Sequence, residues 1–277
     1  MKRMKIKKIE SNAKPSVLIT GAYGGMGKAT AQTLKSLGFR VFALDKNVCE
    51  GEEDIFPVRA DITDENSIND AFRCVSEHTD NLYAVIHFAG VYMLDSLVEI
   101  DNADFDKIFR INLEGVFLIN KIFFPMLSAG SRIVITTSEL APLDPLPFTG
   151  IYAVTKSALD RYAYSLRMEL QLKKITVSVL RAGAVSTGML GVSTDALESF
   201  CRKTEFYNYN AERFKQIVDR VEARSISPSR IADKTVKILN KKNPRFAYSI
   251  NRNPLLLMLN ALPKRVQLWI IKQVLTK

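Results

Sequence analysis

Tyr152 and Lys156 are the residues of this chain whose types and spacing most directly suggest chemistry. On a helix, side chains four residues apart lie on one face, one turn from each other. A nearby cation favours phenolate over phenol, so it lowers the pKa of a tyrosine and lets the hydroxyl exchange a proton near neutral pH. Tyrosine and lysine also stand at this spacing by chance in many helices, so the surroundings of the pair must decide its meaning.

A glycine-rich turn near the N-terminus predicts a nucleotide site. It follows a short apolar strand over 17–20 and opens a predicted helix over 26–37. Glycines permit a tight turn and let a pyrophosphate approach the backbone, where free N–H groups and the positive end of the helix dipole hold the anion. A turn chosen only for packing is the alternative. The candidate cofactor contacts here are Gly21, Tyr23, Gly24, Gly25, Met26 and Gly27.

Asp45 ends the second predicted strand, 18 residues after Gly27. An acidic residue at this place accepts hydrogen bonds from both ribose hydroxyls and repels a 2′-phosphate, which favours NAD over NADP. Two readings compete with this one. Asp45 could be a solvated loop residue, and the neighbouring Lys46 could tolerate a phosphate.

The rest of the chain alternates apolar strands and helices. We predict strands over 17–20, 40–44, 55–58, 84–88, 132–136 and 176–180, and helices over 26–37, 65–77, 105–127, 151–172 and 228–240. This alternation predicts an α/β fold, with a doubly wound parallel sheet covered by helices on both faces of a single domain. We divide the chain into a basic tail over 1–14, a catalytic domain over 15–250 with a substrate lid over about 187–225, and a helical extension over 251–277.

Charge and cysteine usage narrow the functional classes. The net charge is +10, but residues 1–14 hold six Lys/Arg against one Glu (+5) and residues 202–277 hold seventeen Lys/Arg against five Asp/Glu (+12), which leaves −7 for residues 15–201. An acidic main domain argues against nucleic-acid binding. Three scattered cysteines without Cys-x-x-Cys spacing favour a reducing, cytoplasmic location and argue against a disulfide framework or a metal site.

The spacing Gly21-x3-Gly25-x-Gly27, together with Tyr152-x3-Lys156, resembles the short-chain dehydrogenase/reductase family in its shorter, single-domain branch. Matching segments continue in the family's order as far as about residue 190. They contain Asp61 and Ile62 beside the adenine, Ala89 and Gly90 at the end of the Asn-Asn-Ala-Gly motif, Asn112, Ser138, and Gly183, Val185 and Thr187 in the segment over the nicotinamide. Two departures stand out. His87-Phe88 replaces the paired asparagines, and Ala182 replaces a proline. We expect His87 to be a packed, hydrogen-bonded residue.

The resemblance implies a Rossmann-type fold and hydride transfer between a nicotinamide and a carbinol or carbonyl carbon, in an enzyme of the NAD(P)-dependent oxidoreductase class. It gives Tyr152 the role of general acid and base. Lys156 would lower the pKa of that tyrosine and hydrogen-bond the nicotinamide ribose, Ser138 would orient the substrate oxygen, and Asn112 would hold a relay water. The backbone of Val185 and the side chain of Thr187 would hold the carboxamide. Family members are commonly homodimers or homotetramers joined through the helices at 105–127 and 151–172.

Apolar segments predict the substrate class. The loop 140–148 before Tyr152 is apolar, with Glu139 as an odd charge beside Ser138. The predicted lid adds Met189, Leu190, Phe200, Phe206, Tyr207 and Tyr209. These residues favour a hydrophobic alcohol or ketone such as a steroid, bile acid or retinoid. They could instead only seal the core. A small polar ketone, or a non-catalytic nucleotide sensor of the same fold, are the alternative functions.

The C-terminal segment is basic and amphipathic. Residues 254–259 are apolar on every side, and beyond Pro263 a second helix carries an apolar half and a lysine-bearing half, and contains Trp269. Such a helix suits a peripheral contact with an anionic membrane surface. A tail packed on its own domain or on a partner subunit is the alternative.

Overall fold

The computed structural model describes residues 14–221 and 225–277, except for the side chains of 188–194 and 219–221. Of the basic N-terminal tail, only Lys14 falls in these ranges. The side chains of Met189 and Leu190, which the sequence places in the lid, lie outside the description. No helix in the described ranges is long and apolar enough to cross a membrane.

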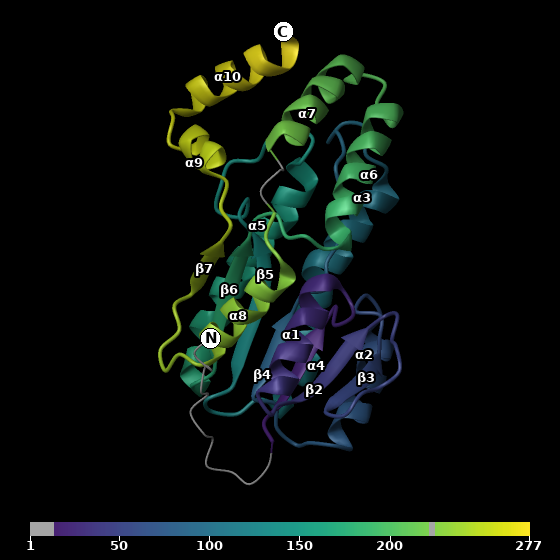
Figure 1. Ribbon diagram of the computed structural model, residues 1–277, viewed down its shortest axis with the longest axis vertical. Coiled ribbons are helices and arrows are strands. Elements are labelled where there is room, and N and C mark those ends of the chain that lie inside the picture. The colour runs from purple at the N-terminus through teal and green to yellow at the C-terminus, as the bar shows by residue number, and fades with distance from the viewer. Residues whose placement is uncertain (1–13, 222–224) are drawn as a thin grey trace.

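One sheet of seven parallel strands forms the centre of the molecule, in the order β3-β2-β1-β4-β5-β6-β7 (Figure 1). The strands are β1 (Ser16–Thr20), β2 (Arg40–Asp45), β3 (Ile55–Arg59), β4 (Ala84–His87), β5 (Arg132–Ser138), β6 (Thr176–Ala182) and β7 (Ala247–Ile250). The strand order reverses between β1 and β4, which is where parallel α/β sheets place their ligands, at the carboxyl ends of the strands. Pro57 lies in β3, an edge strand, where its missing N–H costs little.

Helices cover both faces of this sheet, as the apolar strands predict. Along β1, Val17 and Ile19 pack with α1 (Gly25–Ser36) and α8 (Pro228–Leu239). Leu18 points to the opposite face and packs with α2 (Glu65–Ser76) and α4 (Gly115–Phe123), and farther along that face lies α5 (Gly150–Leu170). Because successive residues of a strand alternate between faces, a strand buried on both sides must be apolar throughout. The predicted doubly wound α/β fold in a single domain is confirmed.

The helix predicted over 105–127 is not continuous. It consists of α3 (Asn102–Phe109), a π-helical turn η1 (Arg110–Glu114), α4, and a 3₁₀ turn η2 (Phe124–Met126). A π-turn inserts one extra residue per turn and is found mostly at functional sites. Asn112 lies at its centre and is completely buried.

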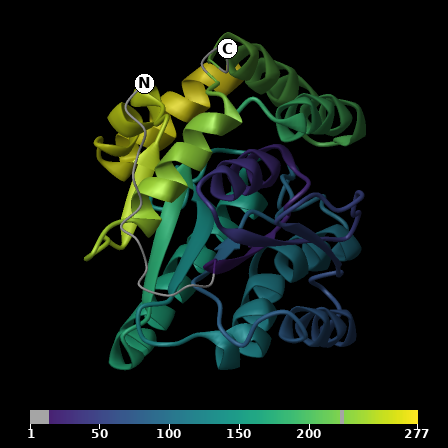
Figure 2. The same cartoon turned by 60° about the horizontal axis from the view of Figure 1, so that its bottom comes forward.

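Several elements in the C-terminal half were absent from the sequence prediction. Strand β7 pairs with β6 and adds a seventh strand at the edge of the sheet. Between β6 and α8 lie α6 (Gly188–Lys203) and α7 (Asn208–Val221), and α5 ends in a 3₁₀ turn η3 (Gln171–Lys173). The helical extension that the sequence does predict over 251–277 consists of α9 (Pro254–Asn260) and α10 (Lys264–Thr276), and α10 packs beside α7 at one end of the molecule (Figures 1 and 2).

Candidate active site

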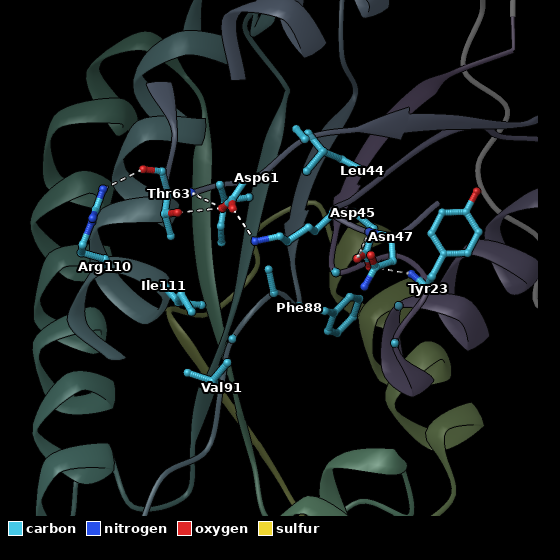
Figure 3. A pocket seen from close by; sticks show the side chains of 18 of the residues that line it. Tyr23, Leu44, Asp45, Asn47, Asp61, Thr63, Phe88, Val91, Arg110 and Ile111 are labelled. Atoms are coloured by element: carbon cyan, nitrogen blue, oxygen red, sulfur yellow. Dashed lines mark hydrogen bonds and ion pairs between the residues drawn. The ribbon is translucent and has the colours of Figure 1, made fainter. Parts of the chain in front are cut away.

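Two adjoining cavities lie at the carboxyl ends of the strands. The first, of about 900 Å³, is lined by the glycine turn after β1 and by residues after β2, β3 and β4, and we call it the glycine-turn cavity (Figure 3). The second, of about 620 Å³, contains Ser138, Tyr152 and Lys156, and we call it the Tyr152 pocket. Met26, Phe88, Gly90, Val91 and Thr187 line both, so the two cavities meet at these residues.

The glycine turn is too tight for side chains at two of its positions. Gly21 has a φ of +65°, and a Cβ on it would lie 2.6 Å from the Ala89 nitrogen. A Cβ on Gly27 would lie 2.1 Å from the Gly21 carbonyl oxygen. On Gly25, a Cβ would lie 2.6 Å from the Thr187 Cγ2 atom, so Thr187 closes over the turn. The N-terminus of α1 therefore faces the cavity with its backbone uncovered, an arrangement that fits a pyrophosphate group.

Asp45 is fixed at the end of β2, where it faces the glycine-turn cavity (Figure 3). Its Oδ2 accepts a hydrogen bond from the Tyr23 N–H at 3.1 Å, and its Oδ1 accepts one from the Asn47 N–H at 3.3 Å. The carboxylate is thus tied to the glycine turn itself. Its position suits the hydroxyls of a ribose whose phosphates lie on that turn.

Asp61 follows β3 and lies across the same cavity. Its carboxylate accepts hydrogen bonds from Lys46 Nζ at 2.8 Å and from the N–H and hydroxyl of Thr63 at 2.9 and 2.7 Å. These contacts, with that of Lys46 the largest, lower the pKa of Asp61 to about 2. Lys46, whose role the sequence left open, is therefore paired with Asp61.

The four predicted catalytic residues come together from three elements. Tyr152 and Lys156 lie one turn apart on α5, with Lys156 Nζ 5.7 Å from the centre of the Tyr152 ring. Ser138 ends β5 and hydrogen-bonds with Tyr152. Asn112 lies behind Gly90, where a Cβ would be 3.1 Å from Asn112 Oδ1 and 3.2 Å from Lys156 Nζ.

The π-turn holds the Asn112 amide in a fixed orientation. Its Oδ1 accepts a hydrogen bond from the Val91 N–H at 2.8 Å, and its Nδ2 donates to the Val91 carbonyl oxygen at 3.0 Å and to Thr155 Oγ1 at 3.2 Å. These three bonds tie the chain after β4 to α5. Asn112 thereby sets how close the Gly90 backbone lies to Lys156.

Burial shifts the two key pKa values in opposite directions. It raises the pKa of Tyr152 to about 12, and the hydrogen bond with Ser138 opposes that rise. It lowers the pKa of Lys156 to about 8. Both follow from the cost of a charge in a poorly solvated place. The lower pKa of Tyr152 that the sequence predicts is not found in the polypeptide by itself, where burial and the Ser138 hydrogen bond are the causes of the shift and Lys156 is not among them.

The two departures from the family pattern have structural explanations. His87 is buried, and its Nε2–H donates to Asn120 Oδ1 at 3.0 Å. Burial lowers the pKa of His87 to about 4, so the ring is neutral, and the prediction of a packed, hydrogen-bonded residue is confirmed. Near Ala182, the Gly183 N–H donates to the Ile250 carbonyl oxygen at 3.0 Å, which anchors this segment to the end of β7.

The structure adds residues to the Tyr152 pocket that the sequence prediction missed. Tyr92 stacks edge-on against Tyr152, with 4.8 Å between ring centres, and its position two residues after Gly90 was the available signal. The far wall comes from α7 and the C-terminal extension. It consists of Phe214, Ile217 and Val218 of α7, Leu255, Leu256 and Leu259 of α9, and Ile270, Ile271, Val274 and Leu275 of α10.

The inner side of the C-terminal extension therefore packs on its own domain. Most of the apolar half seen in the sequence of α10 lines the pocket, and Leu275 is buried there. Leu268 and Trp269 instead face outward, with 66% and 62% of their surface exposed. The predicted single apolar stripe is thus divided between an inner and an outer face.

Comparison with known proteins identifies the family. The short chain dehydrogenase family matches residues 15–198. Versicolorin reductase stcU of Emericella nidulans is 30% identical over 190 residues, covering 64% of this chain and 72% of the relative. Estradiol 17-beta-dehydrogenase 2 of Mus musculus is 32% identical over 188 residues, covering 64% of this chain and 49% of the relative. A short chain dehydrogenase from Burkholderia cenocepacia J2315, solved in complex with NADP, has a TM-score of 0.71 at 19% identity and covers 92% of this chain and 95% of its own.

The chain belongs to the short-chain dehydrogenase family. It is an oxidoreductase of the class that acts on CH–OH and keto groups.

Proposed function

We propose that this protein uses NAD(P) to interconvert a hydrophobic ketone and its secondary alcohol, or an aldehyde and its alcohol. The observation that carries the proposal is the Tyr152 pocket, in which Ser138, Tyr152 and Lys156 stand at one end of a largely apolar cavity of about 620 Å³. A cavity of this size and lining fits a small organic molecule. The relatives named after versicolorin and estradiol support the hydrophobic class of substrate.

The dinucleotide, when bound, supplies or accepts the hydride. The residues of the glycine-turn cavity fit its binding, because the bare turn offers N–H groups to the pyrophosphate and Asp45 lies within reach of the adjoining ribose. In this proposal Asp61 and Ile62 border the adenine, Ala89 and Gly90 border the middle of the molecule, and Gly183, Val185 and Thr187 hold the nicotinamide end. All seven of these residues line at least one of the two cavities.

Tyr152 acts as the general acid in reduction and as the base in oxidation. Since burial holds its pKa at about 12, the hydroxyl is protonated at neutral pH and can donate to the substrate oxygen. Ser138 donates a second hydrogen bond to that oxygen and fixes its position. Lys156 hydrogen-bonds the nicotinamide ribose and stabilises the phenolate left after proton transfer. Asn112 holds the water through which Lys156 exchanges protons with solvent.

We favour NAD over NADP. Asp45 presents a carboxylate where a 2′-phosphate would otherwise lie, and Lys46, the nearest candidate partner for such a phosphate, is paired with Asp61 at 2.8 Å. Both features favour a ribose with free hydroxyls over one that carries a 2′-phosphate.

Absorbance of NADH and NADPH with a panel of steroids, bile acids, retinal and simple ketones tests both the substrate class and the cofactor preference. Tyr152→Phe should lower kcat by about 10²- to 10⁴-fold, the range for loss of a general acid, while NADH still binds. Tyr164→Phe is the matched control, because Tyr164 lies on the same helix and is half exposed. Turnover by Tyr152→Phe at the wild-type rate would contradict the proposal.

The outer face of the C-terminal extension is proposed as a peripheral contact with an anionic membrane. It exposes Met258, Leu268 and Trp269. Residues 251–277 contain no acidic residue, whereas Arg252, Lys264, Arg265, Lys272 and Lys277 are all exposed. Exposed apolar side chains and exposed cations on one short segment match a bilayer surface with anionic lipids. Because the inner face of the same helices lines the Tyr152 pocket, a hydrophobic substrate would reach the pocket from that surface.

Two further properties belong to the proposal. The exposed apolar side chains Phe117 of α4 and Val154 and Met168 of α5 support a homodimer or homotetramer joined through these helices. The scattered, odd-numbered cysteines favour a cytoplasmic location, with the extension at the membrane.

A further inference from the structure

Glu139 is the one acidic residue among those that line the Tyr152 pocket. It follows Ser138 directly, and its backbone N–H donates to the Ala182 carbonyl oxygen at 2.9 Å. A carboxylate beside an apolar cavity costs free energy unless hydrogen-bond donors or cations compensate for its lost hydration. The contacts of the Glu139 carboxylate therefore indicate its role.

The two carboxylate oxygens of Glu139 have different surroundings. Oε2 accepts a short hydrogen bond of 2.6 Å from the Asn253 N–H, at the start of α9. Oε1 accepts no hydrogen bond from the residues that the structure describes. It lies against Gly183, where a Cβ would come within 2.9 Å of it. One oxygen thus anchors the C-terminal extension, and the other retains its full capacity to accept.

The charges around Glu139 permit its carboxylate to accept a hydrogen bond from a bound molecule. Burial raises its pKa, while the Asn253 hydrogen bond and the positive charge of Arg252 oppose the rise. Arg252 and Lys156 are the cations that line the pocket, so a hydroxyl group can bind Oε1 without a further charge being buried. A protonated amine can bind there as well, with a stronger charge-assisted bond but against the repulsion of those two cations.

The position of Oε1 places such a donor close to the reacting carbon. In the proposed function, Ser138 holds the substrate oxygen and Gly183 borders the nicotinamide. Glu139 is adjacent in sequence to Ser138, and its Oε1 lies against Gly183. A donor on the carbon next to the carbonyl is therefore the one that we expect within reach of Oε1.

We propose that Glu139 determines substrate specificity by accepting, through Oε1, a hydrogen bond from a hydroxyl or protonated amino group on the carbon adjacent to the substrate carbonyl. The substrate class is then a hydrophobic α-hydroxy or α-amino ketone, or the corresponding reduced alcohol. This inference rests on the proposed function and narrows it.

The test compares three ketones that share one apolar chain: the plain ketone, its α-hydroxy derivative and its α-amino derivative. For the wild-type full-length protein, kcat/KM should be about tenfold or more higher for at least one donor-bearing ketone than for the plain ketone, as expected where a site hydrogen-bonds a substrate group. Comparison of the α-hydroxy with the α-amino ketone shows whether the donor is a hydroxyl or a protonated amino group. A wild-type ratio near one overturns the proposal, whatever the variants do.

Glu139→Gln separates recognition from anchoring. The glutamine carbonyl oxygen can still accept from the Asn253 N–H, but its amide nitrogen then offers a donor to the pocket instead of an acceptor. The variant should lose the preference for donor-bearing ketones, while NADH affinity and kcat/KM for the plain ketone stay within about twofold, since the acceptor for Asn253 remains. Glu169→Gln, an exposed glutamate on α5, is the matched control and should keep the wild-type ratio.

Two outcomes of the variant experiment would count against the proposal in different ways. If Glu139→Gln keeps the wild-type preference, Glu139 only anchors the extension, and the specificity role is overturned while the proposed function stands. If no ketone of the series reacts with either cofactor in the wild type, the proposed hydrophobic substrate fails and this inference fails with it.

Discussion

At the scale of single residues, burial controls the protonation of three side chains near the active site. Tyr152 is kept neutral by a raised pKa of about 12, and His87 is kept neutral by a lowered pKa of about 4. Lys156, at about 8, remains mostly charged at neutral pH. Tyr152 is thus a ready proton donor close to the cation Lys156, while His87 is uncharged.

The buried His87 predicts a pH dependence of stability. Between pH 6.5 and about 4 the unfolded chain binds a proton on this residue and the folded protein does not. The free energy of unfolding should therefore fall as the pH falls through this range, by up to about 3 kcal/mol from this group alone. Urea unfolding of the wild type and of His87→Asn, the family's residue at this position, measures the contribution as the difference between their slopes.

The exposed His78→Asn serves as the control for this measurement. It should leave the pH slope of the wild type in place. A His87→Asn variant with an unchanged slope would show that His87 titrates normally in the folded protein.

Sequence reasoning predicted most of the candidate active site but not its proton equilibria. Side-chain types and spacing were enough to select Ser138, Tyr152 and Lys156, and the structure brings them into one pocket. The expected lowering of the Tyr152 pKa failed, because spacing gives the distance to a neighbouring charge but not the loss of solvent around the group. Tyr92 was missed because its position two residues after Gly90 is its only signal in the sequence.

At the scale of elements, the glycine turn makes a prediction that two neighbouring positions can test. A Cβ on Gly27 would lie 2.1 Å from the Gly21 carbonyl oxygen, so Gly27→Ala must push the turn apart and should abolish NADH binding. A Cβ on Gly24 would come no closer than 3.4 Å to that same oxygen, so Gly24→Ala should leave the fold of the turn intact and retain more NADH binding than Gly27→Ala. NADH fluorescence titration measures both variants.

Circular dichroism accompanies these titrations and shows whether each variant is folded. Equal NADH affinity for Gly27→Ala and Gly24→Ala would mean that the turn is not where the dinucleotide binds. A folded Gly27→Ala protein without NADH binding is the expected result.

The strands of the sheet were easier to predict than the helices around it. Strands buried on both faces are continuous apolar runs, and six of them were found at almost their observed bounds. The π-turn at Arg110–Glu114 was not foreseen, because an extra residue in one helical turn leaves the apolar spacing on either side intact. Strand β7 was missed since it is only four residues long and three of them are only partly buried.

At the scale of the whole molecule, the C-terminal extension joins the substrate pocket to the molecular surface. Its inner residues close the Tyr152 pocket, and its outer residues form the apolar and basic face. The sequence left two readings open, a membrane helix or a packed tail. The structure places the inner face against the domain, and the outer face keeps the membrane proposal open to test.

The membrane proposal predicts charge-dependent binding to vesicles. The full-length protein should sediment with vesicles that contain phosphatidylglycerol and stay in solution with vesicles of phosphatidylcholine alone. Lys272→Glu should weaken binding by about tenfold or more, because a basic residue near an anionic surface contributes about 1 kcal/mol and the variant reverses one such charge.

Lys242→Glu makes the same charge change in the loop between α8 and β7, away from the extension, and should bind like the wild type. If the two variants lose vesicle binding equally, binding depends on the net charge of the protein and not on the extension. An absence of wild-type binding at low as well as high salt would remove the membrane contact from the proposed function.

The order of synthesis gives the C-terminal extension one more consequence. Every strand of the sheet and the whole glycine turn precede α9 and α10 in the chain, so a ribosome releases the nucleotide site before the last wall of the Tyr152 pocket exists. Domains generally fold as they emerge, N-terminal parts first. The dinucleotide site can then form while the reacting groups still face open solvent, and the Tyr152 pocket gains its last wall only after the sheet is complete.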